Sequence, residues 1–207
     1  MFRVDYLGYR YWTDAVGLPD TLEHTLQIDH EDITVTVAGV MGADAVPRPD
    51  VRVYLFTPEN AYQGIYQLTD ADGRAFFHLP EQAYKVRADY MSRQFWSDAF
   101  TWQDPTVVIP EGVAHVQFSV AGIQVADVTI YAFDGNGSYL GISGKTDADG
   151  RSRFRLAAGG YQFRADFQGN QYWATADVMP DKENDVLIGP GGGTFELTID
   201  TGAGPLA

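Results

Sequence analysis

Two pairs of aspartates have the spacing of calcium ligands. Asp70 and Asp72, and again Asp147 and Asp149, precede a glycine in the same string, Thr-Asp-Ala-Asp-Gly. A complete calcium-binding loop also needs a third oxygen ligand and a distal glutamate, and both copies lack them. The pattern therefore predicts hairpin turns, in which aspartate side chains accept backbone hydrogen bonds and the glycine adopts a positive φ. A weak calcium site is the alternative, and we expect no other cofactor.

Several aromatic side chains could form a platform for a ligand, because flat rings can stack on the faces of sugar rings. The candidates are Trp102, Tyr54, Tyr131, Tyr62 and Tyr139. Exposed aromatic residues are equally typical of contacts between modules or subunits. The sequence leaves glycan binding and protein contact as the two alternatives for these residues.

The remaining polar residues do not form a catalytic pattern. The four histidines are scattered, and the acidic run 29–32 around His30 is better interpreted as a linker than as a metal site. Two Arg-Ala-Asp triplets, 87–89 and 164–166, predict cross-strand ion pairs or arginines stacked on aromatic rings. No nucleophile–base pair, phosphate loop or zinc spacing occurs. We therefore expect no enzyme activity.

Composition narrows the classes of partner. The 207 residues carry a formal net charge of −14, which disfavours nucleic acids and anionic membrane surfaces. With 45% hydrophobic residues the chain can build cores, and with no cysteine it forms no disulfide. No stretch is apolar enough for membrane insertion. The first residues lack the pattern of a signal peptide, so for a secreted protein we expect the signal to lie outside this sequence.

An internal repeat organises the chain. Residues 69–79 are TDADGRAFFHL and residues 146–156 are TDADGRSRFRL, an offset of 77. Residues 51–56 and 84–90 recur at the same offset, as 128–133 and 161–167. A partial third copy at 2–15 matches 86–99 at an offset of 84. Because repeats of this kind mark serial modules, we expect the tail of one module at 1–29, a complete module at 30–118 and a second module at 119–207.

Apolar and polar residues alternate through these segments, which is typical of strands with one buried face. Tyr84, Val86 and Ala88 share one face, and Lys85 and Arg87 share the other. We accordingly expect each full module to form about seven short antiparallel strands in a β-sandwich. One tryptophan recurs in all three copies, and we expect it to occupy an equivalent buried core position: Trp12, Trp96 and Trp173.

The string TDADGR-x-x-F-x-L, followed by an Arg-Ala-Asp strand and an aromatic–Trp pair, resembles repeat modules of large bacterial and archaeal surface proteins. These modules are similar to carboxypeptidase-regulatory-like and Cna-B-type immunoglobulin-like domains. The resemblance covers essentially the whole chain and implies a prealbumin-like all-β sandwich used as a spacer, adhesin stalk or fibre element. Its motifs are specific for a fold and weak for a function.

The expected function is that of a structural or adhesive repeat of an extracellular or cell-surface protein. The chain begins partway through a module, and the second module lacks the opening strand that the first has at Ile33–Val37. The second module either shares a strand across the boundary or has an unpaired edge that accepts a strand from an identical subunit. The alternative function is a carbohydrate-binding module appended to a secreted enzyme.

Overall fold

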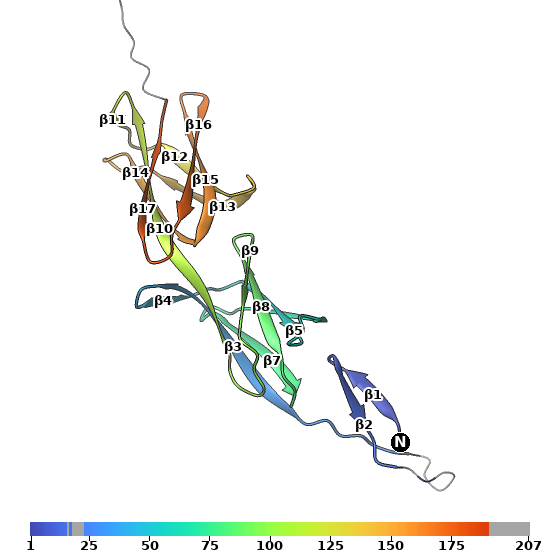
Figure 1. Ribbon diagram of the computed structural model, residues 1–207. Helices are drawn as coiled ribbons and strands as arrows, with labels where there is room; N and C mark the ends of the chain where they lie inside the picture. The colour runs from blue at the N-terminus through green and yellow to red at the C-terminus, as the bar shows by residue number, and fades with distance from the viewer. Residues whose placement is uncertain (16, 18–22, 191–207) are drawn as a thin grey trace, which may run out of the picture.

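The computed structural model describes residues 1–15, 17 and 23–190, and the regular elements among them are β-strands (Figure 1). Two sandwiches follow one another along the chain, and a short hairpin precedes the first. The predicted all-β class with tandem sandwiches is confirmed. None of the described residues belongs to a helix that is long and apolar enough to cross a membrane.

The first sandwich packs two sheets around an aliphatic core. One sheet contains β4 (Asp44–Pro47), β3 (His30–Met41) and β7 (Arg74–Pro80), and β10 (Thr106–Val120) also pairs with β3. The other sheet has the order β6 (Tyr62–Leu68), β5 (Arg52–Phe56), β8 (Lys85–Tyr90), β9 (Arg93–Trp96). Alternate residues of these strands, such as Val35, Val53 and Val86, are completely buried between the sheets.

The second sandwich repeats this plan. One sheet contains β10 together with β11 (Ile123–Gln124), β14 (Arg151–Ala157) and β17 (Glu183–Ile188). The other has the order β13 (Tyr139–Lys145), β12 (Thr129–Asp134), β15 (Gly159–Phe167), β16 (Asn170–Val178). Its core includes the fully buried Val116, Ile130 and Phe163.

Strand β10 belongs to both sandwiches. Its first part, 106–110, pairs in parallel with 36–40 of β3 in the first sandwich. From Glu111 onward it pairs antiparallel with β14, and 113–118 pair in parallel with β17. Figure 1 shows this strand running continuously from one sandwich into the next. The predicted boundary between 118 and 119 is therefore wrong: the chain changes sandwich between Pro110 and Glu111, and the shared strand is the alternative that holds.

The Thr-Asp-Ala-Asp-Gly strings form turns held by aspartate as predicted, but the expectation of hairpins is wrong, because each turn connects strands of two different sheets, β6 to β7 and β13 to β14. The Oδ1 atom of Asp70 accepts hydrogen bonds from the backbone amides of Asp72 and Arg74, both at 2.9 Å. Asp147 makes the same two bonds in the second copy. The glycine that ends each string has a positive φ, 72° at Gly73, which explains why glycine stands there.

The N-terminal hairpin, β1 (Arg3–Tyr6) and β2 (Tyr9–Trp12), is a two-stranded sheet. It corresponds to the hairpins β8–β9 and β15–β16 of the two sandwiches. All three turn through two residues with positive φ: Leu7–Gly8, Met91–Ser92 and Gln168–Gly169. Two such residues give the turn whose twist suits a two-residue hairpin.

The recurring tryptophans are not core residues, so the predicted burial is wrong. The exposed fractions are 55% for Trp12, 39% for Trp96 and 48% for Trp173. The preceding aromatic residue faces the core in each sandwich, as Phe95 does. Because successive side chains of a strand point to opposite faces, the tryptophan must point outward. Each lies directly opposite an arginine on the neighbouring strand: Arg3, Arg87 and Arg164.

Candidate functional site at the joint between the sandwiches

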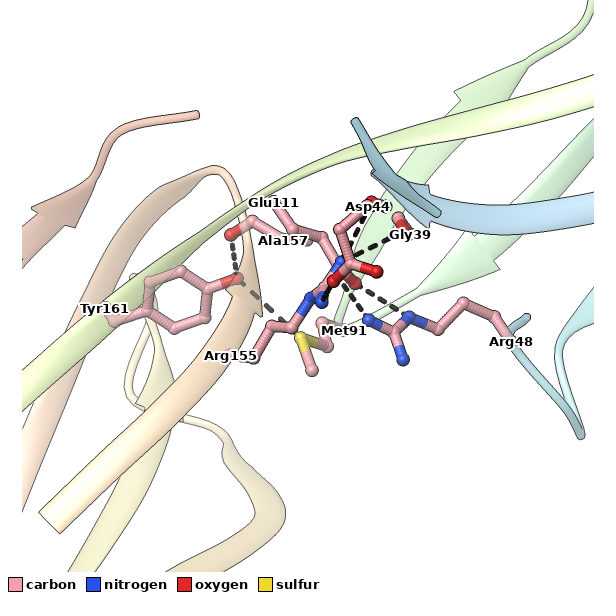
Figure 2. A network of polar contacts seen from close by, with 8 residues as sticks. All are labelled: Gly39, Asp44, Arg48, Met91, Glu111, Arg155, Ala157 and Tyr161. Carbon is pink, nitrogen blue, oxygen red and sulfur yellow. Dashed lines mark hydrogen bonds and ion pairs between the residues drawn. The ribbon is translucent and has the colours of Figure 1, made fainter. Parts of the chain in front are cut away.

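A completely buried carboxylate marks the passage from one sandwich to the other. Glu111 follows Pro110 in β10, and its side chain has no exposed surface. Arg48, which follows β4 of the first sandwich, holds it with two hydrogen bonds, including one from Nε to Oε1 of 2.7 Å. Arg155 on β14 of the second sandwich donates from Nε to Oε2 at 2.6 Å. Figure 2 shows the carboxylate between these two guanidinium groups.

Asp44 completes the network on the first-sandwich side. It accepts a hydrogen bond from the Nη1 atom of Arg155, whose Nη2 atom donates to the backbone oxygen of Gly39 at 3.2 Å. Two carboxylates and two guanidinium groups make the network formally neutral. Burial opposes the charged form of Arg155, but hydrogen bonds to Asp44 and Glu111 outweigh it and raise the pKa of Arg155. Buried ions are tolerated only when they are paired in this way.

Gly39 is required by this arrangement. A Cβ atom at this position would overlap the Glu111 carboxylate and the guanidinium of Arg48. The absence of a side chain on β3 therefore creates the space in which the carboxylate sits. We call Glu111, Arg48, Arg155 and Asp44 the charged clamp.

A hairpin tip of the first sandwich provides further contacts at the same joint. Arg93, just after the β8–β9 turn, donates to the backbone oxygen of Gly160 at 3.0 Å, and its guanidinium lies 5.4 Å from the ring centre of Tyr161. Met91 at the tip packs against the second core. Tyr161 donates its hydroxyl proton to the oxygen of Ala157 at 2.6 Å. Burial raises the pKa of Tyr161, although Arg93 opposes the shift.

At the joint between the N-terminal hairpin and the first sandwich, a hairpin tip also docks on the following sandwich, but no strand is shared between the described residues of the two parts, and the contacts are chemically different. Tyr9 occupies the place of Arg93: its hydroxyl donates to the oxygen of Ala83, and its ring meets that of Tyr84 edge-on at 5.5 Å. His30 stacks on His78 with ring centres 4.9 Å apart. Burial raises the pKa of Tyr9, as expected for a phenol packed against apolar neighbours.

Two clusters of aromatic residues lie on the outer faces of the sheets, one in each sandwich. Arg87 lies over the rings of Tyr54, Phe56 and Trp96 at 4.9, 5.2 and 5.8 Å from the ring centres. Tyr62 packs against Tyr54 at 5.8 Å. The second sandwich repeats the cluster with Arg164, Tyr131, Phe133, Trp173 and Tyr139. The structure thus gathers four of the five candidate aromatic residues into two arginine-centred clusters.

Each cluster also contains an Arg-Ala-Asp triplet, whose arginine forms an ion pair. Arg87 pairs with Asp89 at 2.7 Å, and Arg164 pairs with Asp166 at 2.9 Å. The aspartate neutralises an arginine that already faces aromatic rings. The predicted stacking is therefore observed, but the predicted cross-strand ion pair is wrong, because each arginine pairs with an aspartate of its own strand.

Trp102, the fifth candidate, lies elsewhere. Its indole nitrogen donates to the backbone oxygen of Leu79 at 2.8 Å, and its ring packs against the first core. These contacts assign Trp102 to the packing at the end of the first sandwich, away from the two clusters.

The first aspartate of each pair accepts hydrogen bonds from the backbone amides of its own turn. Hydrogen bonds from the backbone amides, that of Arg74 first, lower the pKa of Asp70. Among the described residues no group of three or more histidine, cysteine, aspartate or glutamate side chains has the arrangement of a metal site. A calcium ligand role for Asp70, Asp72, Asp147 and Asp149 therefore stays a prediction.

The sequence interpretation missed the charged clamp, although a signal was present. Residues 107–118 are strongly apolar, and Glu111 is the one formally charged residue of this stretch at neutral pH if His115 is neutral. A carboxylate inside such a strand must be paired if it is buried. Its partners, Arg48 and Arg155, lie 63 and 44 residues away in sequence and have no local pattern that identifies them.

Comparisons with known proteins give distant similarities. No family model matches the chain, and a comparison with curated proteins found no match. A solved structure of the Bacillus anthracis TIE protein is similar over 75% of this chain, with 17% identity and a TM-score of 0.33, and this chain spans 33% of that protein. The minor pilin GBS52 of Streptococcus agalactiae is similar over 80% of this chain and 99% of its own, with 14% identity and a TM-score of 0.42. A streptococcal ancillary pilin is similar over 92% of this chain and 75% of its own, with 15% identity and a TM-score of 0.37.

Proposed function

We propose that this chain is a spacing element of an extracellular or cell-surface stalk or fibre, in which successive sandwiches are held at a fixed angle. One observation carries the proposal: β10 continues through the joint, and the charged clamp fastens both sandwiches to it at the crossing point. A linker of flexible residues would leave the two sandwiches free to turn. A shared strand with a buried ion network removes that freedom.

The shared strand also provides a path for tension. A pull along the chain would be transmitted through the backbone of β10 and resisted by its ladders with β3, β14 and β17. The chain has no cysteine, so hydrogen bonds and core packing alone would provide this resistance. Sandwiches in series with stiff joints can hold a ligand-binding tip away from a surface, or they can form a fibre.

We infer further that copies are joined by strand exchange. The N-terminal hairpin is a sheet of only two strands among the described residues, and an isolated two-stranded sheet is marginal in water. Backbone hydrogen bonds and alternating side chains from another chain could complete it.

The rigid joint can be tested with two spin labels. Leu68 on β6 and Leu187 on β17 are 53% and 72% exposed, and the chain has no native cysteine, so Leu68→Cys and Leu187→Cys give unique labelling sites. We expect a single narrow distribution of distances between the labels. The matched variant Glu111→Gln removes the charge of the clamp and should broaden it. A broad distribution in the chain that keeps Glu111 would contradict the proposal.

A second function, glycan binding as a module appended to a secreted enzyme, is supported by the arginine-centred aromatic clusters. Tyr62 and Tyr139 are 48% and 50% exposed at the edges of these clusters. Binding on a glycan array that is lost in a Tyr62→Ala, Tyr139→Ala double variant would support this function. Phe76, exposed on the other sheet of the first sandwich, supplies the matched control through Phe76→Ala. If the unmodified chain binds no neutral glycan, glycan binding is excluded as its function.

A further inference from the structure

The strand that opens each sandwich recurs with a period of 81 residues. Thr36 of β3 pairs with Arg74, and Gln117 of β10 pairs with Arg151, which occupies the place of Arg74 one repeat later. Positions 36 and 117 are therefore equivalent, and their offset is 117 − 36 = 81. It exceeds the offset of 77 between the turns because the β3–β4 hairpin is longer than the β10–β11 hairpin by four residues.

The same period continues into the C-terminal segment. The inward residues of the two opening strands are Ile33, Val35 and Val37, and then Ala114, Val116 and Phe118. Adding 81 to the second set gives Phe195, Leu197 and Ile199, which are again apolar. The residues between them, Glu196 and Thr198, are polar, as are Thr34 and Thr36. Residues 191–207 lie outside the described part of the chain, so this step uses their sequence alone. The pattern is that of a third opening strand.

An opening strand packs across the sandwich on a hairpin. In the second sandwich the ring of Phe118 lies 5.2 Å from that of Phe167 on β15 and 5.7 Å from that of Tyr172 on β16. The N-terminal hairpin has Tyr6 and Tyr11 at the corresponding positions. In a sandwich completed on the N-terminal hairpin, the residue equivalent to Phe118 would contact these two tyrosines.

In the N-terminal hairpin this face has no second sheet over it among the described residues. Val4 is 42% exposed, whereas the residues at its position in the two sandwiches, Ala88 and Ala165, are completely buried. Tyr6 is 39% exposed. The hairpin therefore presents an apolar face that matches, in its side chains, the face an opening strand covers elsewhere in the molecule.

We propose that the segment Phe195–Ile199 of one copy of this chain packs on the inner face of the N-terminal hairpin of a second copy. Ile199 then contacts Tyr6 and Tyr11, as Phe118 contacts their counterparts. The stretch Thr25–Asp29, one period before the first part of β10, becomes the parallel neighbour of the incoming strand. This proposal rests on the proposed function, because it names the two partners in the strand exchange between copies.

Charge sets the conditions for this contact. Each copy has a formal net charge of −14, so two copies repel one another at low ionic strength. At 0.1 M salt, such repulsion is largely screened between charges more than about 10 Å apart. Association through an apolar strand should therefore strengthen as salt is added, the opposite of a contact made by ion pairs.

Disulfide trapping between two single variants tests the contact. One preparation carries Tyr6→Cys and the other carries Ile199→Cys, and the native chain contributes no thiol. On mixing and mild oxidation we expect the mixed disulfide to exceed either homodimer, with a yield that rises with salt. Equal yields of mixed and like pairs, or no dimer, would overturn the proposal. A chain carrying both substitutions should give linear multimers, and an intrachain disulfide in a monomer would exclude the second copy as occupant.

A matched pair of variants locates the donor strand. Leu197→Asp places a charge on the inward face and should lower the yield on the order of tenfold or more, because an unpaired charge is costly to bury. Thr198→Asp adds the same charge on the outward face and should change it little. Equal loss in both variants would contradict the register. Failure of trapping combined with a narrow spin-label distribution would reject this assembly and leave the rigid spacing element intact.

Discussion

The two joints of this molecule share a docking hairpin but differ in chemistry, and only the second is crossed by a shared strand, β10. In both, the tip of a hairpin docks on the base of the following sandwich: Tyr9 meets Tyr84 in the first joint, and Arg93 meets Tyr161 in the second. The second joint is filled by a buried ion network, and the first by aromatic and imidazole rings.

The difference can be followed residue by residue through the repeat. His30 stands where Glu111 stands one period later, and His78 stands where Arg155 stands. His30 stacks on His78, and its Nε2 atom lies 3.2 Å from the hydroxyl of Tyr6. His78 is 66% exposed in its side chain, whereas Arg155 is 20% exposed. The comparison teaches that the repeat fixes where a joint lies, while the shared strand and two or three side chains decide how firmly it is held.

The largest expected effect follows from removing the carboxylate of the clamp. Glu111→Ala leaves Arg48 and Arg155 without their shared partner, and breaking a buried ion pair costs about 3–5 kcal/mol. Because both arginines keep some access to water, we expect a loss of about 3 kcal/mol in the free energy of unfolding. Urea denaturation followed by circular dichroism measures it.

The matched change at the first joint is His30→Ala. It removes a partly exposed ring and should cost about 1 kcal/mol or less. Equal losses for Glu111→Ala and His30→Ala would show that the two joints are held equally firmly and would break the comparison.

These contrasts also show what the sequence could and could not predict. Alternation along Tyr84–Ala88 and the Asp-Gly turns predicted the strands and sandwiches, because both depend on local geometry. The predicted burial of Trp96 is wrong because recurrence alone does not indicate burial, whereas the alternation with Phe95 places Trp96 on the outer face. The clamp was missed because Arg48, Glu111 and Arg155 meet only after two sheets have formed and one strand has crossed between them.

The module boundary failed for a related reason. The predicted boundary assigns residues 106–118 to the first module, whereas β10 pairs with β3 up to Pro110 and with β14 and β17 beyond it. A single sequence does not show which strands pair, so it could not place the change of sandwich.

The next effect in size concerns the space for the clamp. Gly39→Ala puts a methyl group into the position of the Glu111 carboxylate, and overpacking of this kind costs about 1–3 kcal/mol. We expect a lower free energy of unfolding and a broader spin-label distribution, because the clamp must shift to accommodate the methyl group. Gly17→Ala is the control, since no atom of the described residues lies within 4 Å of a Cβ at that position. A stability of Gly39→Ala equal to that of Gly17→Ala would show that the carboxylate can move away freely.

A smaller and local effect is expected from Tyr9→Ala. The substitution removes an edge-on aromatic contact and a hydrogen bond to Ala83, together worth about 2 kcal/mol. Amide hydrogen exchange over residues 3–12 should become faster, while exchange in β10 stays unchanged. Arg93→Ala is the counterpart at the second joint, and there the charged clamp should keep β10 and β14 protected. Faster exchange throughout the first sandwich in Tyr9→Ala would mean that the hairpin supports the whole core.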